Sequence, residues 1–99
     1  MKFAFKDTQL EQLFLEGKGA ESLPVGVYRR FLIVMQMISS ASDERIFYAI
    51  KGLKAEKLQG DRAGQISLRL NKQYRLCFEL HKDKNGNIVY ILEIVDYHG

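Results

Sequence analysis

Two arginines in a predicted pair of strands are well suited to binding an anion. Residues 65–70 and 73–80 alternate apolar and polar side chains, which predicts two strands with one buried and one polar face each. The apolar residues are even-numbered in both strands, and pairing them across residues 71–73 places Arg69 opposite Arg75 on the polar face. Like charges directly across a ladder destabilise a sheet. We therefore expect an anion between or above these two side chains.

The end of the chain holds a second group of residues that could take part in a reaction. Asp96, Tyr97 and His98 are consecutive, and a histidine can donate or accept a proton near neutral pH. A tyrosine beside it can stack on a base or orient a phosphate. Taken alone, these residues are more typical of a frayed terminus. The other histidine, His81, follows a predicted strand beside a charged loop and is expected to be a surface residue.

Basic residues are concentrated in the second half of the chain. The net charge is +3, and residues 1–50 contain six basic and six acidic side chains, so residues 51–99 carry the whole excess. A region with this excess of positive charge favours binding of a polyanion such as a nucleic acid. An ordinary solvated surface explains the same charges equally well. The candidate RNA-binding residues are Lys54, Lys57, Arg62, Arg69 and Lys72.

The elements that must position these residues begin with a strand and two helices. Residues 2–6 alternate and predict a first strand. Thr8 followed by Glu11 forms a capping-box pair, and Gly17 is a natural stop, which together predict a helix over residues 8–16. A second helix follows, because apolar residues recur at spacings of three and four from position 27 to 38. It should contain Pro24 in its first turn and end at 39–42, so that the two helices form a hairpin over one face of a sheet.

The remaining segments complete an α+β pattern. Residues 43–50 predict a short helix with Ile46, Phe47 and Ile50 inward, residues 51–64 an irregular segment, and residues 82–87 a hairpin loop. Residues 88–95 are apolar at odd and even positions, which predicts a central strand buried on both faces. We expect an antiparallel-rich sheet of about four strands with an N-terminal helical hairpin packed on it, as one domain over residues 1–99.

Composition sets the outer limits. A chain of 99 residues with 27% charged and 46% hydrophobic residues is typical of one globular domain. Its one cysteine, Cys77, cannot form an internal disulfide, so a reducing compartment and a structural thiol are expected. Neither a signal peptide nor a membrane span is evident, which favours a cytoplasmic protein without membrane contact. No residue pattern calls for a metal or a cofactor.

Three motifs carry a resemblance to a known family. They are Leu-Gln-Gly-Asp-Arg-Ala-Gly at 58–64, Tyr-Arg-Leu-Cys-Phe at 74–78 and Val-Asp-Tyr-His at 95–98. This ordered set is similar to the HigB toxins, which belong to the RelE/ParE superfamily of bacterial toxin–antitoxin systems. The resemblance covers essentially the whole chain and implies a small RelE-like fold.

The resemblance also implies an activity, a site and partners. It implies an endoribonuclease that cuts messenger RNA on the translating ribosome through attack by the 2′-OH, restrained by a helix-turn-helix HigA-type antitoxin in a heterotetramer. The implied catalytic group is Asp96, Tyr97 and His98, with Arg75 on the strand. Two positions depart from the family pattern. Gln59 replaces a lysine, and Glu56 stands where some relatives have a catalytic histidine; it could act as a base but would repel RNA.

Two other function classes remain open. A ParE-like toxin that inhibits gyrase without cutting nucleic acid has the same fold. The terminal Asp-Tyr-His argues against that class, because binding alone requires no titrating group there. A non-toxic nucleic-acid-binding module is the third possibility.

Overall fold

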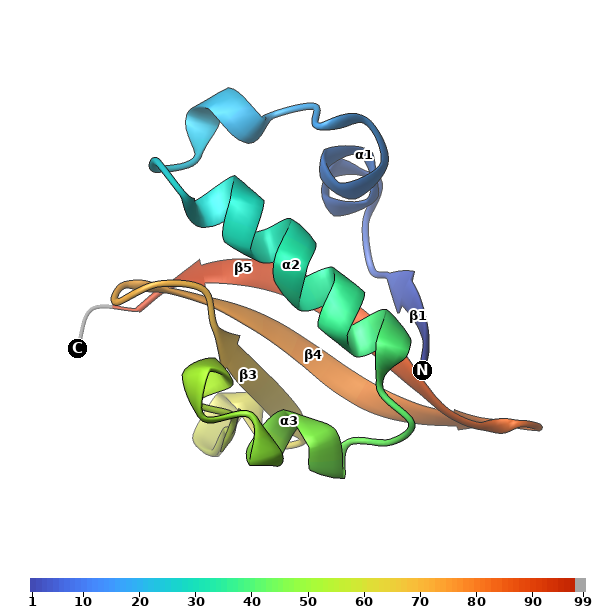
Figure 1. Cartoon of the computed structure of the whole chain (residues 1–99). Helices are drawn as coiled ribbons and strands as arrows, with labels where there is room; N and C mark the ends of the chain where they lie inside the picture. The colour runs from blue at the N-terminus through green and yellow to red at the C-terminus, as the bar shows by residue number, and fades with distance from the viewer. Residues whose placement is uncertain (98–99) are drawn as a thin grey trace.

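A five-stranded sheet and three α-helices form the fold in this computed structural model, which describes residues 1–97 (Figure 1). The predicted α+β class is confirmed. The helices are α1 (Thr8–Glu16), α2 (Val27–Ser40) and α3 (Arg45–Ala49), with short 3-10 turns η1 (Ala20–Ser22), η2 (Lys51–Leu53) and η3 (Gly60–Arg62). The strands are β1 (Lys2–Phe5), β2 (Glu56–Lys57), β3 (Gln65–Arg69), β4 (Tyr74–Asp83) and β5 (Gly86–Asp96).

The strand order is β1-β5-β4-β3-β2, and within residues 1–97 only β1 and β5 pair in parallel. The pairing of β3 with β4 has the predicted register, and Arg69 lies opposite Arg75. The sheet has one strand more than the four predicted, because β2 interrupts the segment expected to be irregular. A two-residue strand is too short to show an alternating pattern in sequence.

A β-bulge explains the apolar run in β5. Val89 and Ile91 are buried on the helical side, and the register then shifts by one residue at Leu92, between the pairs Phe78–Ile91 and Cys77–Glu93. The side chains on the helical side, such as Val89, Ile91 and Ile94, therefore occupy odd positions before the bulge and even positions after it. The predicted central position is confirmed, since β5 lies between β1 and β4, but burial on both faces does not extend to Glu93, which is exposed.

The helices occur where the apolar periodicity predicted them, but their ends differ in detail. The side chain of Asp7, not Thr8, caps α1 by accepting from the backbone N–H of Leu10 at 2.9 Å. Gly17 ends α1 in the left-handed conformation, as predicted. Helix α2 begins after Gly26, so Pro24 precedes its first turn rather than lying within it.

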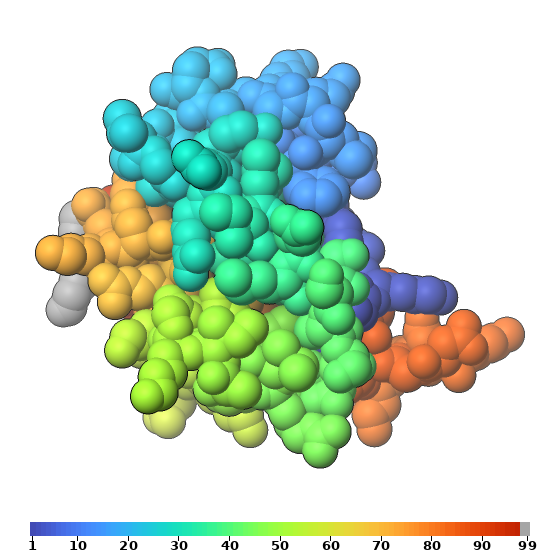
Figure 2. Space-filling model, in the orientation of Figure 1, coloured from blue at the N-terminus to red at the C-terminus, as the bar shows by residue number. Residues whose placement is uncertain are grey.

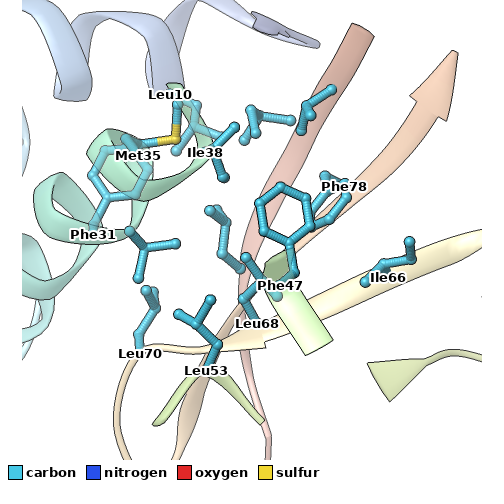
Figure 3. Close-up of a cluster of buried hydrophobic side chains, with 14 of the residues drawn as sticks. Leu10, Phe31, Met35, Ile38, Phe47, Leu53, Ile66, Leu68, Leu70 and Phe78 are labelled. Carbon is cyan, nitrogen blue, oxygen red and sulfur yellow. The ribbon is translucent and has the colours of Figure 1, made fainter. Parts of the chain in front are cut away.

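The core lies between the helices and one face of the sheet (Figures 1 and 3). Phe31, Met35 and Ile38 of α2 are fully buried there. Phe47 of α3 packs edge-on against Phe78, with 5.5 Å between the centres of the two rings. Ile46 is 37% exposed, so the prediction that it faces inward was wrong. The sheet contributes Ile66, Leu68, Leu70, Leu76, Phe78, Val89 and Ile91.

The long β4–β5 hairpin projects from one side of the molecule, as the orange segment in Figure 2 shows. It closes at Lys84 and Asn85, and Gly86 follows with a φ of 117°. The loop is thus shorter than the predicted 82–87, because the flanking residues continue the ladder. Within residues 1–97, none of the helices has the length and apolar character that crossing a membrane requires.

The sheet face turned away from the helices is buried at its centre. Ser67 and Cys77 are inaccessible to solvent, and Arg75 is only 8% exposed. Arg62 of η3 covers part of this face by bonding Gln65 and Glu93. The face predicted to be polar, in contrast to a buried one, is therefore itself buried at these positions.

Candidate active site

A cationic pocket lies where the β3–β4 turn meets the end of β5. These two segments lie at the left of Figure 1. The pocket has a volume of about 320 Å³. Among residues 1–97 the lining contains three basic side chains and no carboxylate, so the pocket favours an anion. The lining residues are Arg69, Asn71, Lys72, Arg75 and Tyr97.

Asn71 shapes the turn that forms one wall of this pocket. Its side-chain oxygen accepts from the backbone N–H groups of Gln73 at 2.8 Å and Tyr74 at 2.7 Å. Asparagine commonly closes turns in this way. Gln73 in turn accepts from the backbone N–H of Tyr97 at 2.5 Å, and its side chain donates to Asp96 at 2.9 Å. The turn therefore holds the end of β5 against the pocket.

Arg75 is fixed at the floor of the pocket by three contacts. Its Nε donates to the Ser67 hydroxyl at 2.7 Å, and its Nη2 donates to the carbonyls of Ser67, at 3.2 Å, and Lys54. The guanidinium carbon lies 5.8 Å from the centre of the Tyr97 ring, a cation–π distance. Nη1 has no partner within residues 1–97, and no buried side-chain nitrogen there is unpaired. Nη1 is therefore not fully buried, and it is the nitrogen of Arg75 that stays available to an anion in the pocket.

Arg69 presents a different edge to the same pocket. It is half-buried, and its Nε donates to the Asn71 carbonyl at 3.2 Å. Both terminal nitrogens of Arg69 have no partner within residues 1–97, so they form a free fork that matches two oxygens of a phosphate. The two arginines are adjacent as predicted, but they differ in what they can offer. Arg69 can make a bidentate contact, whereas Arg75 can donate from one nitrogen.

Comparison with known proteins identifies the family. Residues 3–98 match the model of the HigB-like toxins, described as the RelE-like toxin of the type II toxin–antitoxin system HigB. The chain belongs to this family. This HigB-like toxin is 32% identical over 79 residues to Toxin HigB-1 of Vibrio cholerae, across 80% of the chain and 83% of that relative. The resemblance drawn from the three motifs is confirmed, and an antitoxin is the partner that such a system supplies.

Solved structures share the fold of this HigB-like toxin at low sequence identity. A YoeB/ParE toxin from Agrobacterium tumefaciens has a TM-score of 0.58 and 16% identity, with all of both chains covered. YafQ from E. coli strain BL21(DE3) has a TM-score of 0.57 and 10% identity, covering 96% of this chain and 91% of that one. An archaeal RelE–RelB complex from Pyrococcus horikoshii OT3 has a TM-score of 0.57 and 20% identity, covering 96% and 92%. The RelE-like fold predicted from the motifs is confirmed.

The four remaining basic candidates of the HigB-like toxin occupy different surroundings. Lys72 is exposed at the tip of the turn and lines the pocket. Lys54 is exposed, and its carbonyl contacts Arg75. Lys57 pairs with Ile66, so it points to the helical side of the sheet, away from the pocket. Arg62 is half-buried and forms an ion pair with Glu93 at 3.2 Å.

The predicted catalytic residues gather only in part. Tyr97 lines the pocket, and Asp96 is exposed beside it at the end of β5. His98 lies outside the described residues. Glu56 is exposed opposite Ser67, so it shares the face of Arg75 but does not line the pocket. Within residues 1–97 no cluster of three or more metal-ligating side chains is present.

Sequence reasoning missed Asn71, Gln73 and Ser67. Asn71 carries a recognisable signal, because asparagine between two predicted strands favours a turn that it bonds itself. The predicted register places Ser67 diagonal to Arg75 on the same face, within reach of a long side chain. The burial of Ser67 has no local signal, since serine is usually an exposed residue. Gln73 shows none either, because its contacts are with the end of β5.

Proposed function

We propose that this HigB-like toxin is a ribosome-dependent endoribonuclease that cleaves messenger RNA during translation. The observation that carries the proposal is the pocket of Arg69, Lys72, Arg75 and Tyr97, whose lining within residues 1–97 is cationic and contains no carboxylate. Tyr97, which lines this pocket, directly precedes His98 in the chain. A phosphodiester is an anion that such a lining attracts, and an adjacent histidine can move protons at neutral pH.

Cleavage through the 2′-OH needs a base for that hydroxyl, charge stabilisation at phosphorus and an acid for the departing 5′-oxygen. The free fork of Arg69 can bind both non-bridging oxygens of the scissile phosphate. Nη1 of Arg75 adds one hydrogen bond as negative charge accumulates on the phosphorane. Because Arg75 is already held by protein acceptors, it needs no reorganisation when that charge develops.

Proton transfer to the departing 5′-oxygen is assigned to the end of the chain, and removal of the 2′-OH proton to a separate base. His98 is the general acid toward the 5′-oxygen, and Asp96 orients it. Tyr97 stacks on a base or orients the phosphate beside Arg75. Glu56 shares this face of the sheet and is the candidate base, although its charge would oppose RNA.

The surrounding charges and the partners complete the proposal. Lys72 and Lys54 lie on or beside the pocket and contact RNA backbone, so binding to the ribosome should weaken steeply with salt. Lys57 points to the other side and would contact a different stretch of RNA. The proposed antitoxin is of the helix-turn-helix HigA type in a heterotetramer. The proposed location is the cytoplasm, with residues 1–99 acting as one domain.

Expression in bacteria with mapping of messenger RNA ends tests this proposal. The parent protein should arrest growth and create new RNA ends within translated regions, and Arg69→Ala should remove both effects. Arg29→Ala is a matched control, because it removes one exposed cation from α2 on the helical side. Growth arrest without new RNA ends would support gyrase inhibition instead. Absence of toxicity would support a binding module.

A further inference from the structure

We propose that Ser67 is a positioning residue, which together with the carbonyl of Lys54 aims the guanidinium of Arg75 at the scissile phosphate. This inference rests on the proposed nuclease function and names a residue that the three sequence motifs do not contain. Ser67 and the Lys54 carbonyl are called the arginine socket below.

The socket occupies the edge of Arg75 that would otherwise form a bidentate contact. A guanidinium has five N–H donors. The Nε–H bonds the Ser67 hydroxyl, and Nη2 is shared between the carbonyls of Ser67 and Lys54. Only the two N–H groups of Nη1 stay uncommitted within residues 1–97. The socket thus fixes which nitrogen of Arg75 faces the pocket.

Burial gives the Ser67 hydroxyl its importance. Ser67 is inaccessible to solvent and Arg75 nearly so, so water cannot easily replace a lost bond between them. If the hydroxyl is removed, the Nε–H is left without its acceptor at 2.7 Å. The guanidinium then turns to satisfy that donor, and Nη1 leaves its direction toward the phosphate.

The backbone at Lys54 supports the same reading. Lys54 is the only residue other than glycine within residues 1–97 that has a positive φ, at 45°. Residues other than glycine rarely adopt this backbone conformation, so the surrounding structure must enforce it. In this conformation the Lys54 carbonyl reaches Nη2 of Arg75 from the segment that precedes β2. A strained backbone and a buried hydroxyl therefore converge on one guanidinium.

Ser67→Ala tests the socket, with Cys77→Ala as the matched control. Cys77 lies directly opposite Ser67, is equally buried, and also loses one side-chain heavy atom, but it has no bond to Arg75. In ribosome-dependent cleavage, kcat of Ser67→Ala should fall about 10- to 100-fold while KM changes less than about 3-fold. Cys77→Ala should keep the parental kcat. Its melting temperature should change by about as much as that of Ser67→Ala.

The isosteric pair Ser67→Thr and Ser67→Val tests the hydroxyl at constant volume, and it serves if the alanine variant fails to fold. Thr should retain cleavage and Val should lose it. Nitrogen-15 NMR of the Arg75 Nε–H gives a readout without activity. Its exchange with water should be slow in the parent, in Cys77→Ala and in Ser67→Thr, and fast in Ser67→Val.

The outcomes separate this inference from the proposed function. If the parent cleaves RNA and Ser67→Ala or Ser67→Val cleaves as fast, the positioning role is overturned while the nuclease assignment stands. The same holds if their loss is only of melting temperature and matches that of Cys77→Ala. If the parent does not cleave RNA, the proposed function fails, and the aim toward a phosphate fails with it. NMR then decides only whether the socket holds Arg75.

Discussion

Replacing Arg75 by alanine should destabilise the fold as well as stop catalysis. Three acceptors around Arg75 lose their donor in a site that water reaches poorly: the Ser67 hydroxyl, the Ser67 carbonyl and the Lys54 carbonyl. A hydrogen bond to a charged group contributes about 1.5–3 kcal/mol. The cost of burying the guanidinium itself offsets part of this sum. We therefore expect the free energy of unfolding to fall by about 2–5 kcal/mol.

Arg69→Ala is the natural comparison, because it removes the same side chain from the facing position of the ladder. Arg69 makes one bond to protein within residues 1–97, at 3.2 Å, and its removal relieves like-charge repulsion with Arg75. The free energy of unfolding should change by no more than about 1 kcal/mol. Both variants should lose cleavage.

Urea denaturation of the two variants and the parent measures this difference. Each 1 kcal/mol also shifts the melting temperature of a domain this size by roughly 4–8 °C, so a thermal scan provides a second readout. Arg75→Lys keeps a charge but cannot reproduce the fork, and it should be destabilised by an intermediate amount. If Arg75→Ala unfolds at the same urea concentration as Arg69→Ala, the guanidinium is not a structural element and the reasoning from its burial is wrong.

Three further predictions concern the tail, the strained backbone and the buried thiol. His98→Ala should reduce cleavage by roughly 10²–10⁴-fold and abolish growth arrest while antitoxin binding persists; parental activity in single-turnover assays would remove His98 from the mechanism. Lys54→Gly should raise the free energy of unfolding by about 1 kcal/mol, since glycine adopts the left-handed conformation freely, and an unchanged urea midpoint would argue against strain there. Burial raises the pKa of the Cys77 thiol, so it should react with a thiol reagent only after unfolding, and rapid labelling of the native protein would contradict its burial.

Much of the fold follows from local sequence patterns, because periodicity reports which side of an element is buried. The alternation in β3 and β4 predicted their register correctly, down to the facing arginines. The apolar run of β5 misled because a bulge and a strand buried on both faces produce the same pattern. The two residues of β2 carry no pattern at all.

The candidate site was less accessible to sequence reasoning. The sequence predicted that Arg69 and Arg75 lie opposite each other on one face of the sheet. It did not predict that they differ in their hydrogen bonds. That difference depends on the positive φ of Lys54 and on the buried Ser67, which are set by chain segments that meet only in the folded protein. Likewise, charge alone makes Lys57 a candidate RNA-binding residue, but its register in β2 points it to the side of the sheet away from the pocket.

A reconstituted translation reaction tests whether this HigB-like toxin is a ribosome-dependent endoribonuclease. Purified toxin is mixed with a defined messenger RNA, with and without programmed ribosomes, and the 5′ ends of the products are mapped. Cleavage within the translated region should occur only when ribosomes are present, and it should be lost in Arg69→Ala, which should remain folded. Intact messenger RNA in the presence of ribosomes and parental toxin would contradict the account, as would equal cleavage by Arg69→Ala.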